Sequence, residues 1–299
     1  MKVFITGGTG FVGKTLVQKL YEKGHLITVL SRQGKGPFPN EVKILTGDPT
    51  QRGPWQADVS DQDVIINLAG ASIFQRWTDE AKEQIRNSRI QTTKNLVDAL
   101  RNASHHVLLM STSAVGYYGP SGDEILTEEA PPGSDFLARL AVDWEREAMR
   151  AANLGHKVII MRFGIVLGRR GGALQFMAKP FKYFLGSGLG SGKQYFSWIH
   201  ERDLVEIFLF LMGKDISGPV NCTSPNPVTN QELTRLIGKV LKRPVILPNV
   251  PGFMLRLLLG EFAQVILTGQ RVIPERLTQM GYKFLFPKLE DALRDLLEP

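Results

Sequence analysis

The stretch GGTGFVG, residues 7–13, carries three glycines with the spacing G-x-x-G-x-x-G. It follows the apolar run KVFIT and opens a helical pattern, so it lies where a strand turns into a helix. There Gly7 permits a tight turn, Gly10 lets the backbone approach a pyrophosphate, and Gly13 lets the helix pack close to the strand. The helix N-terminus offers free N–H groups and a positive dipole end to phosphates. The motif predicts a dinucleotide site, and a purely structural turn is the alternative.

The end of the second apolar run, Leu30-Ser31-Arg32, indicates which dinucleotide is bound. An NAD site usually has Asp or Glu about 20 residues after the glycines, where the carboxylate holds the ribose 2′-hydroxyl. Here Ser31 can donate to a phosphate oxygen, and Arg32 can bind it with two N–H groups or stack on adenine. Lys35 follows closely, and no carboxylate is present to repel a 2′-phosphate. The sequence therefore predicts NADP(H) as the cofactor.

Two further side chains could move protons. Tyr117 follows a predicted strand that ends in Ser-Thr-Ser at 111–113, at the sheet edge where such folds bind ligands. A phenol needs a nearby cation to act as an acid near neutrality, and Arg162 or Arg89 could supply it. His200, within WIHERD, suits proton transfer near neutrality. Each residue also has a structural interpretation, Tyr117 as a packed aromatic and His200 as an oriented residue at a strand end.

The composition limits the class of protein. The 299 residues are 43% hydrophobic and 22% charged, as in ordinary globular proteins. Cys222 is the single cysteine, so we expect no internal disulfide, no metal site and a reducing compartment such as the cytoplasm. The first residues, MKVFITGG, already have a strand pattern, so we expect no secretory segment. No apolar run reaches the ~18 residues that a membrane span needs.

The net charge of +7 raises the question of an acidic partner. The basic residues are scattered, and their only adjacent pairs are Arg169-Arg170 and Lys242-Arg243. We therefore favour a solvated basic surface and a small-molecule substrate over nucleic acid. One C-terminal apolar stripe has helical spacing, which predicts core packing, with a homodimer face as the alternative. Its residues are Phe253, Leu257, Leu258, Phe262 and Ile266.

The elements that must position these residues alternate along the first 165 residues. Apolar runs predict strands buried on both faces of a parallel sheet, and they are KVFIT, LITVLS, VKILTG, DVIINLAG, HVLLMSTS and KVIIMRFG. Helical patterns cover residues 10–23, 78–103 and 134–154. The segment between the third and fourth runs is rich in Pro, Gly and Asp and leaves little room for a helix. This order predicts an α/β fold with a Rossmann-type doubly wound parallel sheet.

The regular alternation fades after residue 165, where glycine-rich loops begin. The patterns then predict a helix that starts at Asp203, a strand near 219–222, and further helices at 229–241, 252–268 and 274–280. We therefore predict an NADP(H)-binding domain at 1–165 and a small mixed α/β substrate lobe at 166–299.

The glycine spacing, NLAG at 67–70 and the serine-rich fifth run resemble extended short-chain dehydrogenase/reductases. Four later stretches narrow the resemblance to a subfamily of NAD(P)-dependent epimerase-like proteins, some of which are labelled cell-division inhibitors in cyanobacteria and plastids. These stretches are SAVGYYG (113–119), RFGIVLG (162–168), GSGKQYFSWIHERD (190–203) and GQRVIPERL (269–277). The subfamily has a short C-terminal domain of unknown function, which corresponds to about 250–297 here.

The resemblance implies roles for particular residues. Thr9, Gly10, Phe11 and Val12 would line the phosphate loop, while Leu68, Ala69 and Gly70 would pass beside the adenosine and ribose. In the helix after NLAG, Arg89 would reach the cofactor with help from Gln84. Ser113 would correspond to the catalytic serine or threonine that binds a substrate carbonyl. The residues expected near the nicotinamide are Arg162, Gly164 and Ile165.

One feature of the family is missing. Its members use a Tyr as acid and, four residues later, a Lys that lowers the tyrosine pKa and holds the ribose, but these positions fall near Leu137 and Ala141. Any chemistry would then come from Ser113 with Tyr117, assisted by His200. The first hypothesis is an atypical NADP(H)-dependent oxidoreductase or epimerase acting on a small polar carbonyl or sugar-like substrate. The second is a non-catalytic NADPH-binding regulatory or redox-sensing protein.

Overall fold

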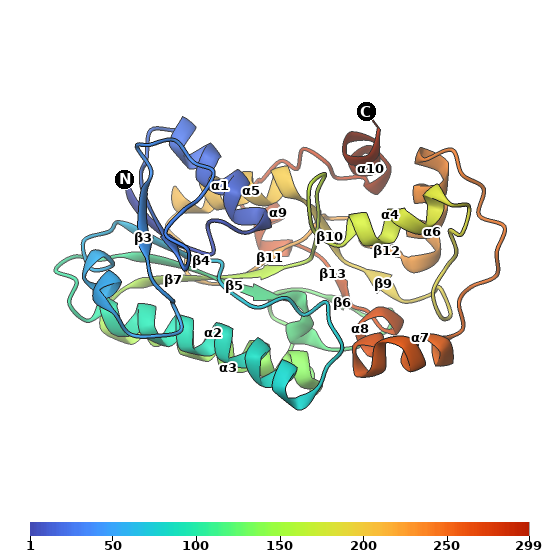
Figure 1. Ribbon diagram of the computed structural model, residues 1–299, viewed down its shortest axis with the longest axis horizontal. Coiled ribbons are helices and arrows are strands. Elements are labelled where there is room, and N and C mark those ends of the chain that lie inside the picture. The colour runs from blue at the N-terminus through green and yellow to red at the C-terminus, as the bar shows by residue number, and fades with distance from the viewer. Residues whose placement is uncertain (299) are drawn as a thin grey trace.

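The computed structural model describes residues 1–298, and its main element is a seven-stranded sheet in which all neighbouring strands are parallel. The strand order is β11-β7-β5-β4-β1-β2-β3 (Figure 1). The strands are β1 (Lys2–Thr6), β2 (Leu26–Ser31), β3 (Lys43–Thr46), β4 (Val64–Asn67), β5 (Leu108–Ala114), β7 (Lys157–Phe163) and β11 (Gly218–Cys222). The central strands are buried on both faces, which explains their continuous apolar runs. The predicted Rossmann-type fold is confirmed.

Helices cover both faces of the sheet (Figure 1). They are α1 (Phe11–Glu22), α2 (Asp79–Leu100), α3 (Phe136–Met149) and α5 (Glu201–Met212). Leu16 of α1 and Phe208 of α5 belong to one buried apolar cluster, and Leu96 of α2 and Ala148 of α3 belong to another. Between β3 and β4 there is only a 3-10 turn, Pro54–Asp58, as the Pro and Gly content of that segment predicts.

The rest of the chain forms the smaller mixed α/β region. It contains β8 (Ile165–Leu167), β9 (Tyr195–Phe196), β10 (Trp198–His200), β12 (Val228–Thr229), α4 (Leu174–Lys182), α6 (Asn230–Val240) and α10 (Leu289–Leu297). The short helix α9 (Glu275–Gln279) packs on the large sheet instead, since its Leu277 is buried in the same apolar cluster as Leu16 and Phe208. Two short strands, β6 (Ile125–Leu126) and β13 (Arg271–Val272), pair with each other in parallel. β11 also comes from this part of the chain but pairs with β7 as the edge of the large sheet. The predicted boundary at residue 165 therefore precedes the last strand of the sheet.

Two helix predictions are wrong in detail. The helix predicted at 252–268 is divided into α7 (Gly252–Leu259), a 3-10 turn (Gly260–Phe262) and α8 (Ala263–Leu267). The break occurs at Gly260, whose φ of +61° lies outside the helical region. Consequently the apolar stripe is not a core face, because Leu257 is 78% exposed whereas Phe262 is buried. The helix predicted from Asp203 begins earlier, at Glu201, and His200 is its N-cap.

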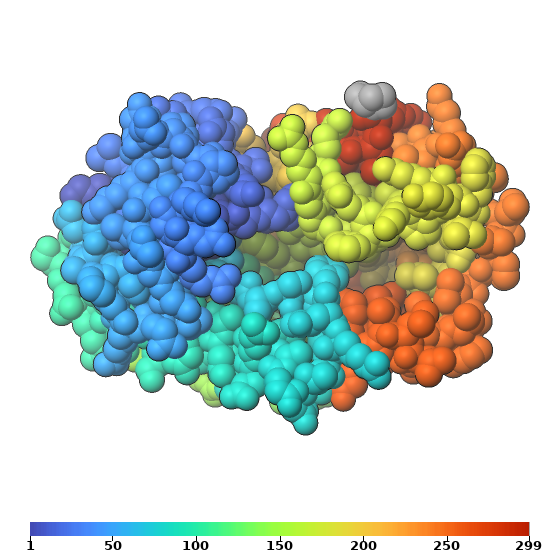
Figure 2. All heavy atoms as spheres, viewed as in Figure 1, coloured from blue at the N-terminus to red at the C-terminus, as the bar shows by residue number. Residues whose placement is uncertain are grey.

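A hollow separates the large sheet with its helices from the smaller region (Figure 2). In the same view β5 ends in this central area (Figure 1). The hollow therefore lies at the carboxyl ends of the parallel strands, where doubly wound folds bind ligands. No helix in the described residues 1–298 is long and apolar enough to cross a membrane.

Candidate functional site

The glycine turn has the geometry that a phosphate site requires. Gly7 has a φ of +71°, and a Cβ there would lie 2.7 Å from the carbonyl carbon of Leu68. A Cβ on Gly13 would lie 2.3 Å from the Gly7 oxygen, so neither position accepts a side chain. Gly10 is the N-cap of α1 and provides no side-chain cap, which leaves the first N–H groups of the helix free. A Cβ on Gly10 would meet only the Gly7 oxygen, so its other side is open to a ligand.

The neighbouring residues of the turn face different surroundings. Val12 packs against the apolar cluster between the sheet and helices α1 and α5. Phe11 instead faces the smaller region, because a Cβ on Gly168 or Gly171 would lie within 2.4 Å of its ring. The phosphate turn and the glycine-rich loop after β8 are therefore in direct contact. Thr9 lies against the segment that follows β2, since a Cβ on Gly36 would be 3.3 Å from its Cγ2.

The contact between Thr9 and the segment after β2 brings the predicted 2′-phosphate residues beside the glycine turn. Ser31 is buried, and its hydroxyl donates to the Lys35 carbonyl over 3.1 Å. Arg32 is exposed and forms no ion pair with any residue in 1–298. A guanidinium free of carboxylates beside a phosphate turn suits an additional phosphate group.

The second wall of the site follows β4. Leu68 continues that strand through a hydrogen bond from its N–H to the Thr6 oxygen, and the close approach of Gly7 places the 68–70 segment against the glycine turn. Arg89 of α2 reaches this segment, because a Cβ on Gly70 would lie 3.1 Å from its Cζ. Ala69 lies between them on the same segment. The structure thus brings together the three stretches that the sequence assigns to the cofactor.

Arg89 has an unusual environment for a cation. It donates to the carbonyl oxygens of Ala71 and Ile85, both over 3.0 Å, and lies 5.3 Å from the Trp144 ring. It forms no ion pair among the described residues. Burial lowers the pKa of the Arg89 guanidinium to about 10, so it is still charged at neutral pH. Gln84 is exposed on α2 and makes no side-chain hydrogen bond within residues 1–298.

The carboxyl ends of β5 and β7 meet in a buried polar cluster. Ser113 donates to Glu145 Oε1 over 2.6 Å, and Arg162 donates to the two oxygens of the same carboxylate over 2.9 and 2.8 Å. Arg162 also donates to the Tyr118 hydroxyl and to the Glu128 carbonyl. Ser113 and Arg162 are only 1% and 3% exposed. We call Ser113, Tyr118, Glu145 and Arg162 the Glu145 cluster.

Hydrogen-bond capacity within the Glu145 cluster is largely used. Arg162 employs four of its five N–H groups, so little remains for the cofactor contact that the resemblance implies. Burial alone would lower the pKa of Arg162, but the hydrogen bonds and charge of Glu145 outweigh it and raise the pKa above its usual value. Burial also raises the pKa of Tyr118 to about 12 despite Arg162. Glu145 was not predicted from the sequence as a site residue, although an acid directly after the apolar Trp144 in this helix could have indicated one.

Tyr117 differs from Tyr118 in its freedom. The centroid of the Tyr117 ring lies 3.5 Å from the guanidinium carbon of Arg162. The Tyr117 side chain is only partly buried. Its hydroxyl makes no hydrogen bond to the described residues, whereas the Tyr118 hydroxyl donates to Asn221 over 2.7 Å. Tyr117 therefore has a fixed ring and an available phenol group.

The positions of the missing dyad are apolar in the structure as well. Leu137 lies beside the turn after β5, since a Cβ on Gly116 would be 3.3 Å from the Leu137 Cβ. Ala141 is buried, with 4% of its surface exposed. Leu137 also lines a cavity of about 470 Å³ with Trp77 and residues of the C-terminal segment. The remaining lining residues are Asp135, Phe136, Arg256, Gly260, Glu261, Gln264 and Val265.

His200 does not lie in a ligand site. Its side chain is fully buried, its ring stacks on Phe286 at 3.9 Å, and its Nδ1 accepts the Arg202 N–H over 3.0 Å. Its Nε2 lies 3.2 Å from Asp295. Burial lowers the pKa of His200 to about 4, so the ring is neutral near pH 7. These contacts give His200 a structural role at the start of α5. The catalytic hypothesis therefore rests on Tyr117 without His200.

Gly164 and Ile165 connect β7 with the smaller region. Gly164 donates its N–H to the Cys222 oxygen over 3.0 Å, and Ile165 donates to the Ser197 oxygen over 2.8 Å. A Cβ on Gly164 would lie 2.9 Å from that Ser197 oxygen. Glycine is required here because the two backbones come so close.

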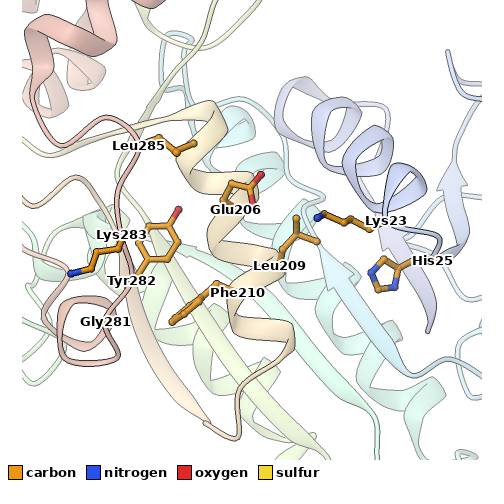
Figure 3. A pocket seen from close by; sticks show the side chains of 9 residues that line it. All are labelled: Lys23, His25, Glu206, Leu209, Phe210, Gly281, Tyr282, Lys283 and Leu285. Carbon is orange, nitrogen blue, oxygen red and sulfur yellow. The ribbon is translucent and has the colours of Figure 1, made fainter.

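A second cavity lies elsewhere. It measures about 660 Å³, and Figure 3 shows Lys23 and His25 on one side and Tyr282 and Lys283 on the other, with Glu206, Leu209 and Phe210 of α5 between them. Lys23 caps the C-terminus of α1, roughly 18 Å of helix away from the glycine turn. This cavity therefore lies away from the glycine turn.

Known proteins resemble the chain along its whole length. The profile of the NAD dependent epimerase/dehydratase family matches residues 3–222, and that of a domain of unknown function (DUF1731) matches residues 250–296. The chain belongs to the NAD dependent epimerase/dehydratase family. The predicted C-terminal family domain is thereby confirmed.

Relatives within the family include the Arabidopsis thaliana chloroplastic homolog of epimerase family protein SDR39U1, 41% identical over 100% of this chain and 87% of that protein. Epimerase family protein SH2119 of Staphylococcus haemolyticus is also 41% identical, over 100% of both chains. Human epimerase family protein SDR39U1, solved with NADPH, superposes with a TM-score of 0.86 at 32% identity and covers 99% of both chains. MoeE5 with UDP-glucose and NAD reaches 0.80 at 18% identity, which shows a shared fold only.

Proposed function

We propose that the protein binds NADP(H) and acts as an atypical oxidoreductase or epimerase on a small polar carbonyl or sugar-like substrate. The human relative that superposes over 99% of both chains was solved with NADPH. The residues of this chain fit that cofactor. The open side of Gly10 and the free N–H groups of α1 suit the pyrophosphate, and Arg89 beside Gly70 supplies an unpaired positive charge.

The preference for the 2′-phosphate rests on the segment after β2. Arg32 is exposed and unpaired, Ser31 precedes it, and both follow a strand that ends beside the glycine turn. A carboxylate that would select the bare ribose is absent from this segment. The single cysteine further favours action in a reducing compartment such as the cytoplasm.

The observation that carries the enzyme proposal is the free hydroxyl of Tyr117. When bound, NADPH supplies a hydride to a carbonyl carbon. The protein would then have to hold the carbonyl and deliver a proton to its oxygen. The Arg162 guanidinium contacts the face of the Tyr117 ring, and Glu145 holds Arg162 through hydrogen bonds. Ser113 would act as a positioning residue through its hydrogen bond to Glu145 rather than by touching the substrate.

The experiment is a screen of metabolite extracts in which NADPH absorbance and thermal stabilisation are followed together. Once a turned-over substrate is found, Tyr117→Phe should lower the rate by about 10²-fold, as expected for a proton donor. Tyr118→Phe is the matched control, because it removes a phenol hydroxyl from the next residue, which should lower stability more than rate. Equal rates in the wild type and Tyr117→Phe would refute the assignment.

The second candidate is a non-catalytic NADPH-binding regulator. Leu137 and Ala141 provide neither an acid nor a ribose ammonium, and the Ser113 hydroxyl is already bound to Glu145. In the same screen, this alternative predicts stabilisation by NADPH without oxidation in any extract. Oxidation that depends on Tyr117 would exclude it.

A further inference from the structure

Arg271 on β13 has a guanidinium without a polar partner. It forms neither an ion pair nor a side-chain hydrogen bond with any residue in 1–298. Its guanidinium carbon lies 5.0 Å from the centroid of the Tyr195 ring, and both side chains are partly buried. The Tyr195 hydroxyl likewise makes no hydrogen bond within the described residues. A partly desolvated cation without a counter-charge attracts an anionic ligand.

The backbone holds Arg271 firmly from two sides. The Ser197 hydroxyl donates to the Gln270 carbonyl over 2.7 Å and accepts the Val272 N–H over 3.0 Å. On the other side, Arg271 pairs with Ile125 of β6. Val272 is fully buried in an apolar cluster, and because side chains alternate along a strand, Arg271 points the opposite way, toward Tyr195. The guanidinium is therefore carried by a fixed strand and not by a loose loop.

Ser197 also connects Arg271 to the end of β7. The Ser197 oxygen accepts the Ile165 N–H over 2.8 Å and nearly touches Gly164. The family resemblance implies that Gly164 and Ile165 lie near the nicotinamide of the cofactor. In Figure 1, β13 and β6 lie beyond the end of β5, between the large sheet and the smaller region. Arg271 thus lies near the end of the site where a substrate would react.

We propose that Arg271 and Tyr195 form a subsite for an anionic group of the substrate, a carboxylate or a phosphate monoester. The guanidinium would bind two oxygens of the anion, and the phenol of Tyr195 could donate a third hydrogen bond. The residue comes from the C-terminal domain of unknown function, so this domain would contribute directly to substrate selection. This proposal rests on the proposed function, because it places the substrate beside the cofactor.

The test titrates NADPH-saturated protein with succinate and, separately, with inorganic phosphate in a calorimeter. We expect wild-type protein to bind at least one of them, and Arg271→Gln to weaken that binding by about tenfold or more. Arg271→Lys should retain part of it, and Tyr195→Leu serves as a second variant if Arg271→Gln does not fold. Arg243→Gln is the matched control, since Arg243 also stacks on an aromatic ring, Phe184 at 4.6 Å, but is exposed. A response to succinate alone identifies a carboxylate subsite, and a response to phosphate alone a phosphate subsite.

Two results would overturn the subsite: neither anion binds wild-type protein, or Arg271→Gln binds as tightly as Arg243→Gln. NADPH affinity is measured on the same samples and should change by less than about twofold in Arg271→Gln. If NADPH itself does not bind the wild type, the proposed function fails, and the same titrations without NADPH then decide the subsite alone.

Discussion

Arg162 and Arg89 are two inward-facing arginines at the ligand-binding edge of the sheet, and their surroundings differ sharply. Arg162 shares a carboxylate with Ser113 and uses four N–H groups within the Glu145 cluster. Arg89 donates only to two carbonyl oxygens and has no carboxylate partner in residues 1–298. A buried charge costs free energy unless it is paired. The paired arginine therefore stabilises the fold, whereas the unpaired one is available to an anionic cofactor.

The pKa shifts of these arginines follow the same division. Glu145 raises the pKa of Arg162 in spite of its burial, while burial alone lowers the pKa of Arg89 to about 10. Arg32 and Arg271 resemble Arg89 because they too form no ion pair among the described residues. For these arginines, unused hydrogen-bond donors indicate a ligand-binding role better than a position at the end of a strand does.

The largest expected effect is the loss of the Arg162–Glu145 pair. Arg162→Met leaves a buried carboxylate without its cation and should lower the free energy of unfolding by about 3–5 kcal/mol. Denaturant unfolding of both proteins measures this. Arg86→Met is the control, because its pair with Asp143 is exposed and should contribute less than about 1 kcal/mol. A loss of the same size in both variants would contradict the structural role of the Glu145 cluster.

The next effect concerns His200, which, like Arg162, is buried with its hydrogen-bonding groups already paired. Its folded-state pKa of about 4 is below the ordinary 6.5, mainly because of burial, so the folded protein binds fewer protons than the unfolded chain between these values. The contribution of His200 to the free energy of unfolding should be fully present above pH 6.5. It should fall by roughly 3 kcal/mol as the pH drops toward 4. Unfolding measured across this range checks the prediction. His200→Asn, which can still cap α5, should flatten this part of the profile, and an unchanged slope would count against it.

Local patterns in the sequence predicted the features that depend on neighbouring residues. The glycine turn and the strand–helix alternation are of this kind, because each is determined within a few residues. The role of His200 could not be predicted, since its partners Phe286 and Asp295 come from more than 80 residues later in the chain. Glu145 was overlooked for a similar reason, as its partners come from β5 and β7.

The smallest expected effect is a change in cofactor preference. Arg32→Asp should weaken NADPH binding and improve NADH binding, which shifts their affinity ratio by about tenfold or more, because a carboxylate repels the 2′-phosphate and accepts from the ribose hydroxyl. Titration by nicotinamide fluorescence gives both affinities. Lys242→Asp reverses a charge of the same sign at a distant surface position and should leave the ratio unchanged. An unaltered ratio in Arg32→Asp would refute the NADP(H) assignment at this position.

The contrast between the paired and unpaired arginines is tested most directly by Arg89→Gln. NADPH affinity and the unfolding temperature are measured together for this variant and for Arg162→Met. We expect Arg89→Gln to weaken NADPH binding by about tenfold or more without lowering the unfolding temperature of the cofactor-free protein, because it removes a partly buried charge that has no carboxylate partner. An Arg89→Gln variant that binds NADPH as tightly as the wild type, or that unfolds as early as Arg162→Met, would contradict this account.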